Sequence, residues 1–133
     1  MSPYLHERHF SLDEAQQALI KIRPLIQEVR TLKAKLDRLG FSLSQVPDKP
    51  SPQPSTNGHK PFPSEFIRLT YVLNRLVRLG IQIRDMSRGL IDFPHIRKNG
   101  EEVYLCWKMG EKVIRYWHPV DEGFSGRRHI DKL

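Results

Sequence analysis

The sequence lacks several features that would identify a location or a function directly. Its single cysteine among 133 residues excludes an intramolecular disulfide and a structural zinc site made of cysteines alone. No apolar run approaches the length of a membrane span, and the N-terminus is polar and lacks the apolar stretch of a signal peptide. We therefore expect a protein of the reducing cytoplasm that has no membrane partner.

The short motifs of common enzyme classes are also missing. The sequence has no phosphate loop, dinucleotide fingerprint, HExxH motif or nucleophile elbow. His6 and His9 are close in sequence, but two histidines on a polar terminus make a poor metal site. Cys106 lies in an apolar stretch with no neighbouring base, which favours a buried and unreactive thiol. We expect no metal site and no cofactor, and the sequence favours a protein that is not an enzyme.

The sequence does contain enough apolar residues for one core, together with an excess of positive charge. It is 38% hydrophobic and 28% charged, which is typical of a single globular domain covering residues 1–133. Lys and Arg outnumber Asp and Glu by 22 to 15, which gives a formal net charge of +7. This excess favours anionic partners such as nucleic acid, phosphorylated metabolites or acidic proteins.

Residues 10–40 have the pattern of a long amphipathic helix. Ser11 and Glu14 form a capping box at its start, apolar residues then recur in steps of three and four, and Gly40 can end it. Pro24 lies inside this pattern and removes one backbone hydrogen bond. We therefore expect one helix that is kinked at Pro24.

A linker and a second helix follow. Residues 41–64 contain six of the ten prolines and predict a flexible linker or, alternatively, a proline-rich ligand for a partner domain. Residues 65–79 predict a second amphipathic helix, with Ser64 as its cap and Gly80 as its end. Two such helices predict an antiparallel hairpin. Because the hairpin leaves part of the first apolar stripe uncovered, we expect a homodimer or larger homo-oligomer formed through the helices.

The outer face of the second helix is basic. Arg68, Tyr71, Arg75 and Arg78 follow one another in steps of three and four. This pattern is typical of a solvated helix face, and it also fits a ridge that contacts a nucleic-acid backbone.

After Gly80 the hydrophobic period changes from 3.6 to 2. Residues 81–118 predict an antiparallel meander of three or four strands, in which one short apolar run ends at Pro94. Residues 119–133 are expected to form a C-terminal tail. The predicted fold class is α+β, a long antiparallel helical hairpin followed by a small antiparallel sheet with one face on the helices.

The register of the last strand pair is open by one residue. A tight turn around Gly110-Glu111 joins the strands, and its register decides whether Trp117 or Tyr116 shares a face with Trp107.

Residues that can form a site are concentrated near the C-terminus. His118, with Asp92 or Asp121 close to it, can orient a ligand or move a proton. The turn Gly123–Arg127 can bind a phosphate or carboxylate, and Tyr104, Trp107 and Trp117 can wall the pocket. The alternative is structural: the aromatic residues and Phe124 fill the core, and Arg127 pairs with Asp92 or Asp121. The candidate ligand-binding residues are Asp92, Tyr104, Trp107, His118 and Arg127.

Several of these residues recur in the order found in a known family. They are Phe10-Ser-Leu-Asp-Glu14-Ala15, Gly89-Leu-Ile-Asp92-Phe93-Pro94, Tyr104-Leu-Cys106-Trp107, Gly110-Glu111, Trp117-His118 and Gly123-Phe124-Ser-Gly126-Arg127. The chain resembles the bacterial and archaeal family known as domain of unknown function 2203, except in the Pro-rich segment, where the family has a charged helical hairpin. The resemblance implies a small protein of helices and a sheet, and it implies no activity.

These observations favour a non-catalytic, oligomeric binding or regulatory module for a small anionic ligand or a partner protein. The first alternative is a nucleic-acid-binding protein that uses Arg68, Arg75 and Arg78. The second alternative is a small enzyme that uses His118 with an aspartate.

Overall fold

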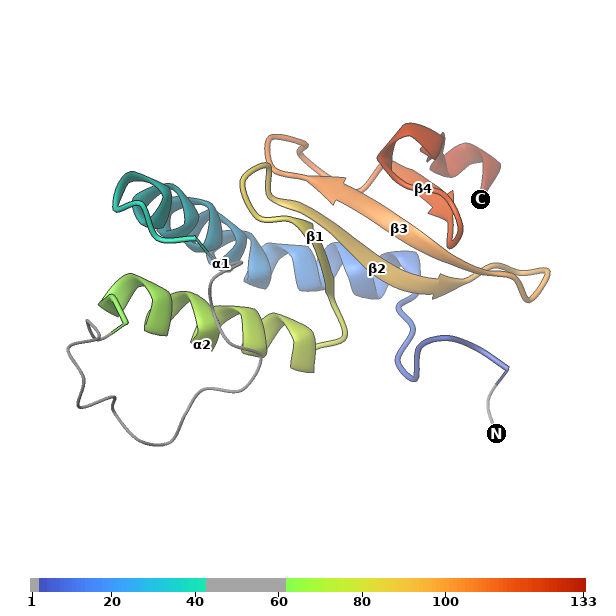
Figure 1. Ribbon diagram of the computed structural model, residues 1–133. Coiled ribbons are helices and arrows are strands. Elements are labelled where there is room, and N and C mark those ends of the chain that lie inside the picture. The colour runs from blue at the N-terminus through green and yellow to red at the C-terminus, as the bar shows by residue number, and fades with distance from the viewer. Residues whose placement is uncertain (1–2, 43–61) are drawn as a thin grey trace.

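The computed structural model describes residues 3–42 and 62–133. Within these ranges the chain contains two α-helices and a five-stranded antiparallel sheet, which confirms the predicted α+β class (Figure 1). Helix α1 is Leu12–Arg38 and helix α2 is Ser64–Arg78. Most of the predicted linker, residues 41–64, lies outside the described residues.

Helix α1 begins at the predicted capping box. The Ser11 hydroxyl accepts a hydrogen bond from the Glu14 N–H at 3.0 Å, and the Glu14 carboxylate accepts one from the Ser11 N–H at 2.9 Å. At the other end Gly40 has a φ of 70°. The Phe41 N–H then bonds the Leu36 carbonyl at 2.9 Å, so the glycine ends the helix as predicted.

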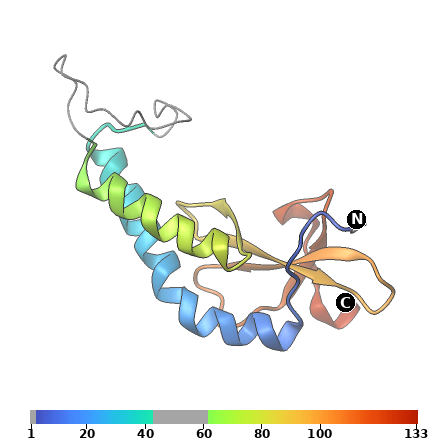
Figure 2. The ribbon, with the colours of Figure 1, turned by 90° about the horizontal axis from the view of Figure 1, so that it is seen from below.

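Helix α2 lies beside the C-terminal half of α1 in both views (Figures 1 and 2). The Phe66 ring is 5.1 Å from the Phe41 ring, which follows the end of α1. The predicted cap is wrong: Ser64 is the first residue of the helix, and its hydroxyl faces the Glu65 carboxylate. Pro63 occupies the cap position instead, and its φ of −58° directs the chain into the helix.

In the described ranges, each strand of the sheet pairs with its neighbours in chain order. The strands are β1 (Gln82–Asp85), β2 (Leu90–Ile96), β3 (Glu102–Lys108), β4 (Tyr116–Pro119) and β5 (Arg128–His129). The predicted count of three or four strands is wrong because the tail, residues 119–133, returns to the sheet as β5. A two-residue strand is too short to produce a period-two pattern, so no sequence pattern indicated β5.

Strand β2 runs through Pro94, where the sequence predicted its end. Pro94 lies opposite Tyr104 of β3, and its carbonyl accepts a hydrogen bond from the Phe10 N–H at 2.7 Å. The N–H and C=O of a strand residue point to the same neighbour, so the missing N–H of Pro94 faces the Phe10 side rather than β3. Strand β1 pairs with β2 no further than Asp92, so no ladder bond is lost.

The sheet packs one face into the core. Trp117 lies opposite Leu105, and Trp107 lies opposite Ile91, so Trp117, not Tyr116, shares the face of Trp107. These side chains join α1 and α2 in one buried apolar cluster. Each large apolar side chain buried there contributes about 1.5–3 kcal/mol. We call this the core face of the sheet, and the other side the open face.

The apolar stripe of α1 is covered within the chain. Its members are buried against the sheet and α2, namely Ala15, Leu19, Ile22, Ile26, Val29, Leu32 and Leu36. Neither helix in the described ranges is long and apolar enough to cross a lipid bilayer.

Candidate functional site

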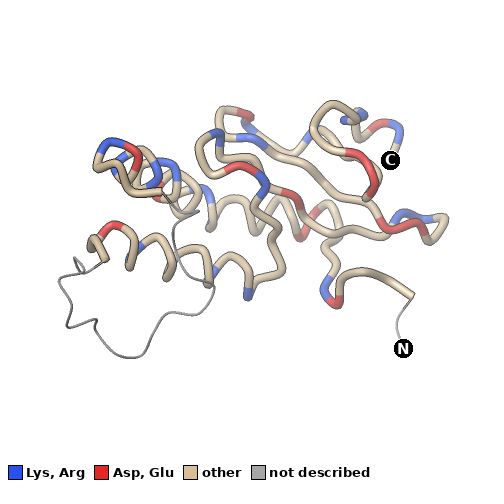
Figure 3. Tube along the Cα trace, in the orientation of Figure 1, with Lys and Arg blue, Asp and Glu red and all other residues tan. Residues whose placement is uncertain are grey.

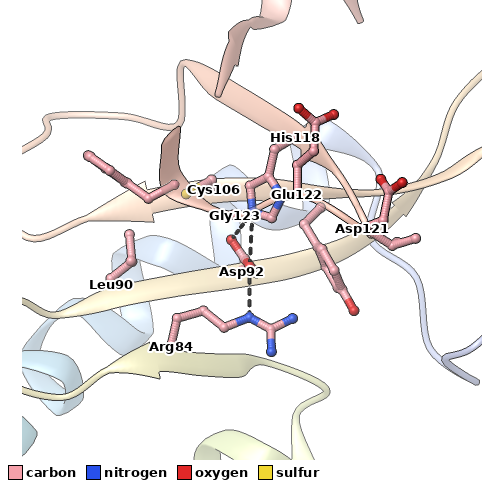
Figure 4. Close-up of a pocket in the computed structure, with 11 residues that line it drawn as sticks. Arg84, Leu90, Asp92, Cys106, His118, Asp121, Glu122 and Gly123 are labelled. Carbon is pink, nitrogen blue, oxygen red and sulfur yellow. Dashed lines mark hydrogen bonds and ion pairs between the residues drawn. The ribbon is translucent and has the colours of Figure 1, made fainter. Parts of the chain in front are cut away.

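A pocket of about 300 Å³ lies on the open face of the sheet. Its floor comes from strands β2, β3 and β4, and its rim comes from β1 and residues 120–124 (Figure 4). The pocket lies on the side of the sheet facing away from the core, so its lining residues alternate along each strand with core residues.

The strand register brings the floor residues together. Asp92 is the cross-strand partner of Cys106, and Tyr104 is the partner of His118. Cross-strand partners point to the same side of a sheet, as do residues two apart on one strand. Asp92, Tyr104, Cys106 and His118 therefore form one group on three adjacent strands.

The carboxylate of Asp92 is at the centre of this group. It is 1% exposed, and both of its oxygens lie 3.0 Å from Nε2 of His118. The Nε of Arg84 donates to Oδ2 of Asp92 at 2.9 Å. A buried charge is tolerated only when it is paired and hydrogen-bonded, and these two neighbours meet that requirement.

His118 has a hydrogen-bond partner at each ring nitrogen. Its Nδ1 lies 2.9 Å from the carbonyl of Pro119, which can only accept, so Nδ1 is the donor. Burial opposes the charged form of His118, but the hydrogen bond and the negative charge of Asp92 outweigh it. The pKa of His118 is therefore raised above its ordinary value.

Cys106 completes the floor as a buried thiol. Burial raises the pKa of this thiol, and the nearby Asp92 carboxylate raises it further. The thiol therefore stays protonated at neutral pH, in keeping with the expectation of an unreactive cysteine. Together with Asp92 and His118, however, it offers three metal-ligand atoms within 4.8 Å of one another.

The N-terminal segment covers one end of the open face. Nε2 of His6 lies 2.6 Å from the hydroxyl of Tyr104, and Nε2 of His9 lies 2.7 Å from the carboxylate of Glu102. The two histidines thus have separate partners on β3. Burial raises the pKa of Glu102, but hydrogen bonds from His9 and from the N–H groups of Leu5 and His6 outweigh it, so the pKa is lowered.

Of the predicted ligand-binding residues, the structure brings Asp92, Tyr104 and His118 together. Trp107 is elsewhere: it is fully buried on the core face, and its Nε1 donates to the Glu111 carbonyl at 2.9 Å. Tyr104 and Trp107 are three residues apart on one strand and therefore point to opposite sides. The assignment of Trp107 to the pocket wall is corrected on this ground.

Arg127 is also placed differently from the expectation. Its guanidinium donates to both carboxylate oxygens of Glu111 at 2.7 Å, not to Asp92 or Asp121. It also lies over the ring of Tyr116 at 4.0 Å. This ion pair fastens the C-terminal segment to the β3–β4 connection, which favours the structural alternative for Arg127.

The turn before Arg127 forms a short helix at the pocket rim. Phe124–Gly126 is one turn of 3-10 helix, and Phe124 is 37% exposed beside the pocket rather than in the core. A Cβ on Gly126 would come within 2.8 Å of the Glu122 side chain. Glycine therefore allows the rim to fold closely onto itself.

Arg84 and Cys106 are among the pocket residues that the sequence pattern was not used to predict. Both could have been found from the period of two: Arg84 alternates with Ile83, and Cys106 is two residues from Tyr104. What the period could not supply was the pairing of β1 with β2, which places Arg84 beside Asp92.

The basic face of α2 does not form an isolated ridge of positive charge. Arg68 donates two hydrogen bonds to Glu28 of α1, at 2.7 and 3.0 Å, and its guanidinium lies over the Tyr71 ring. Figure 3 shows Lys and Arg interspersed with Asp and Glu along the described chain. The nucleic-acid alternative therefore stays a prediction, with the charge of Arg68 already balanced.

Comparison with known proteins supports the family resemblance. Neither the curated proteins nor the solved structures contain a significant match to this chain. A family model described as an uncharacterized conserved protein, DUF2203, matches residues 8–130. Because this match covers nearly the whole chain, the protein belongs to the DUF2203 family.

Proposed function

We propose that the protein is a non-catalytic module that binds a small anionic ligand in the pocket on the open face of the sheet. The observation that carries this proposal is Arg84, whose Nε donates to Asp92 while the side chain is 40% exposed at the pocket. A guanidinium has five N–H donors, so Arg84 can donate to a further acceptor while its Nε stays bonded to Asp92. Figure 4 shows the two terminal nitrogens of Arg84 turned away from Asp92.

The charges of the pocket support an anion. Arg84 offsets the negative charge of Asp92, and the raised pKa of His118 favours a positive charge beside the pair. The rim carries the carboxylates of Asp121 and Glu122, and the ion pair of Glu122 with Arg128 at 3.1 Å offsets the repulsion of an anion by Glu122. The rings of Tyr104 and Phe124 add apolar surface around a small ligand.

The chemistry of His118 supports binding rather than catalysis. Nδ1 faces the Pro119 carbonyl and Nε2 faces Asp92, so a protonated ring has both donors engaged. An imidazolium in this state has no lone pair with which to act as a general base. The second alternative, an enzyme that uses His118, therefore has less support than a binding site.

The experiment is a titration of the full chain with inorganic phosphate, followed by calorimetry and by thermal unfolding. Arg84→Gln is expected to abolish the heat of binding and the thermal stabilisation. The matched control is Arg115→Gln, which removes the same charge from an exposed position outside the pocket and is expected to bind like the wild type. Equal affinity in the Arg84→Gln and wild-type proteins, or no phosphate binding by the wild type, would overturn the proposal.

The proposal includes the arrangement of the helices that support the sheet. We infer an antiparallel hairpin of α1 and α2, supported by the contact of Phe66 with Phe41 and by the ion pair of Arg68 with Glu28. A bend at Pro24 remains part of it, because this residue lies inside α1. Residual dipolar couplings on the two halves of α1 would measure the angle between them, and collinear halves would remove the bend.

Homo-oligomerisation through the helices is also part of the proposal. The sequence argument for an oligomer was an uncovered apolar stripe on α1, and this argument is weaker because the stripe is buried within the chain. The apolar residues that support it now are those exposed on the helices, Ile20 at 67%, Ile67 at 62% and Val77 at 60%. Sedimentation of the wild type and of Ile67→Lys would test the oligomer, and a monomeric wild type would contradict it.

We also propose that the protein is located in the cytoplasm, where the Cys106 thiol stays reduced.

A further inference from the structure

The floor of the pocket brings together three side chains of the kinds that bind transition metals. The ligand atoms of Asp92, Cys106 and His118 lie within 4.8 Å of one another, and all three residues are buried. They come from β2, β3 and β4, whose pairing fixes their relative positions. Carboxylate oxygen, thiolate sulfur and imidazole nitrogen are the ligand atoms that zinc takes in proteins.

We propose that Asp92, Cys106 and His118 bind one divalent transition-metal ion of the zinc class, with its fourth position open to the cavity. This inference rests on the proposed function, because it assigns the metal to the pocket of the anionic ligand. Three protein ligands and one open position are typical of zinc sites that bind a further small molecule. An anion that enters the cavity then completes the coordination of the metal.

The surrounding hydrogen bonds orient the ligands as a metal site requires. The Nδ1–H of His118 donates to the Pro119 carbonyl at 2.9 Å, so Nε2 is the nitrogen directed at Asp92. A metal-binding histidine usually donates its other N–H to a carbonyl or carboxylate in this way. Arg84 donates to Oδ2 of Asp92, which leaves Oδ1 for the metal.

The distances fit a tetrahedral site after a small adjustment. With ordinary zinc–ligand bond lengths, the nitrogen, oxygen and sulfur atoms of such a site are separated by about 3.4–3.6 Å. Nε2 of His118 and Oδ1 of Asp92 are 3.0 Å apart. The widest separation within the group of three is at most 4.8 Å. Binding therefore requires changes of about 1.2 Å or less, which are within the reach of side-chain rotation.

Metal binding is an exchange of the ion for protons. The thiol proton of Cys106 and any proton shared by His118 and Asp92 are released to solvent, and no electron is transferred. A set that includes thiolate and imidazole selects zinc-class ions over magnesium and calcium, which prefer oxygen ligands. The sequence expectation of no metal site did not include these three residues, because their grouping depends on strand pairing.

The experiment uses the untagged full chain, treated with chelator and then titrated with Co²⁺ as a spectroscopic substitute for zinc. We expect one equivalent of Co²⁺ to produce a thiolate-to-cobalt charge-transfer band in the near ultraviolet. Added Zn²⁺ should displace the Co²⁺ ion and remove the band. Cys106 is the only cysteine of the chain, so such a band can come only from this residue.

Three variants locate the site. Cys106→Ser is expected to abolish the band, and both Cys106→Ser and His118→Gln are expected to weaken Zn²⁺ binding by about ten-fold or more. His129→Gln removes a histidine that lines no part of the pocket and is expected to bind Zn²⁺ like the wild type. Circular dichroism establishes that each variant is folded. The nearly isosteric Cys106→Ser decides the matter if His118→Gln unfolds.

The inference and the proposed function can fail separately. Absence of the band in the wild type, or Zn²⁺ affinity unchanged in Cys106→Ser, overturns the metal site. Phosphate binding that depends on Arg84 in chelator-treated protein would then leave the anion-binding function intact. Conversely, one equivalent of Co²⁺ bound through Cys106, with no phosphate binding in either state, supports the metal site and overturns the proposed function.

Discussion

The two faces of the sheet are equally buried at their centres but differ in chemistry. On the core face, Phe93 and Leu105 are fully buried among apolar side chains of the helices. On the open face, Asp92, Cys106 and His118 are 1–3% exposed, and they lie beside a cavity. Burial is stabilising for the first group and costly for the second, unless every polar atom has a partner. The open face is therefore built for something other than stability.

The largest expected effect is on the core face. Trp107→Ala removes the largest side chain at the centre of the sheet and its hydrogen bond to the Glu111 carbonyl. We expect the free energy of unfolding to fall by about 3–5 kcal/mol in urea denaturation. The neighbouring Cys106→Ala, on the open face, should lower it by roughly 1 kcal/mol. Equal losses in the two variants would contradict the distinction between the faces.

The next effect concerns Arg127, which the sequence predicted as a ligand-binding residue. Arg127→Ala breaks the ion pair with Glu111 and the contact with the Tyr116 ring. The Arg127 side chain is only 12% exposed, so water screens this ion pair weakly. We expect a loss of about 2 kcal/mol of stability, since hydrogen bonds to charged groups are worth about 1.5–3 kcal/mol. Phosphate affinity of the folded variant should be unchanged. Lost affinity with unchanged stability would return Arg127 to the ligand site.

The sequence was sufficient for the elements that depend on local signals. The capping box of Ser11 with Glu14 predicted the start of α1, and the period of two predicted the strands of the sheet. The same period also separates Tyr104 from Trp107, three residues apart, so this error in the predicted site could have been avoided. A local pattern fixes which residues share a face, even before the partner strand is known.

The features that the sequence did not predict depend on contacts between distant parts of the chain. The partner of Arg127 is sixteen residues away in a connection between strands, and charge alone could not choose among Asp92, Asp121 and Glu111. The sequence predicts a strand end at Pro94, because it cannot show that the backbone nitrogen of Pro94 faces the Phe10 side rather than a neighbouring strand. Tertiary contacts settle such alternatives, and propensity does not.

A smaller effect depends on pH at the end of the open face. The carboxylate of Glu102, whose side chain is 8% exposed, accepts hydrogen bonds from His9 and from two N–H groups of the N-terminal segment. Its lowered pKa means that this stabilisation is complete above the ordinary value of 4.5 and is lost as pH falls through the lower value of the folded protein. We expect Glu102→Gln to cost about 1–2 kcal/mol near neutral pH.

The difference in the free energy of unfolding between the wild type and Glu102→Gln should shrink on acidification, because Glu102 is then protonated and both side chains are neutral. Urea denaturation at a series of pH values from 7 to 3 measures it. The control is Glu101→Gln, an adjacent carboxylate that is 47% exposed and is expected to change stability by less than about 0.5 kcal/mol at every pH. A constant difference for Glu102→Gln across the series would show that the N-terminal segment does not depend on this charge.

The smallest effect on stability is expected for Arg128 at the rim of the pocket. Phosphate affinity should change more there than the free energy of unfolding. Arg128 pairs with Glu122 at 3.1 Å, and both side chains are more than 40% exposed, so Arg128→Gln should alter the free energy of unfolding by less than about 1 kcal/mol. The variant leaves the Glu122 carboxylate unbalanced at the mouth of a pocket that we propose for an anion. Calorimetry should therefore show phosphate affinity reduced several-fold at low salt. The reduction should diminish at high salt, where charges separated by more than a Debye length of about 3 Å at 1 M are screened. Phosphate affinity equal to that of the wild type at low salt would mean that the ligand does not approach across this rim, and that the open face is entered from the side of β1.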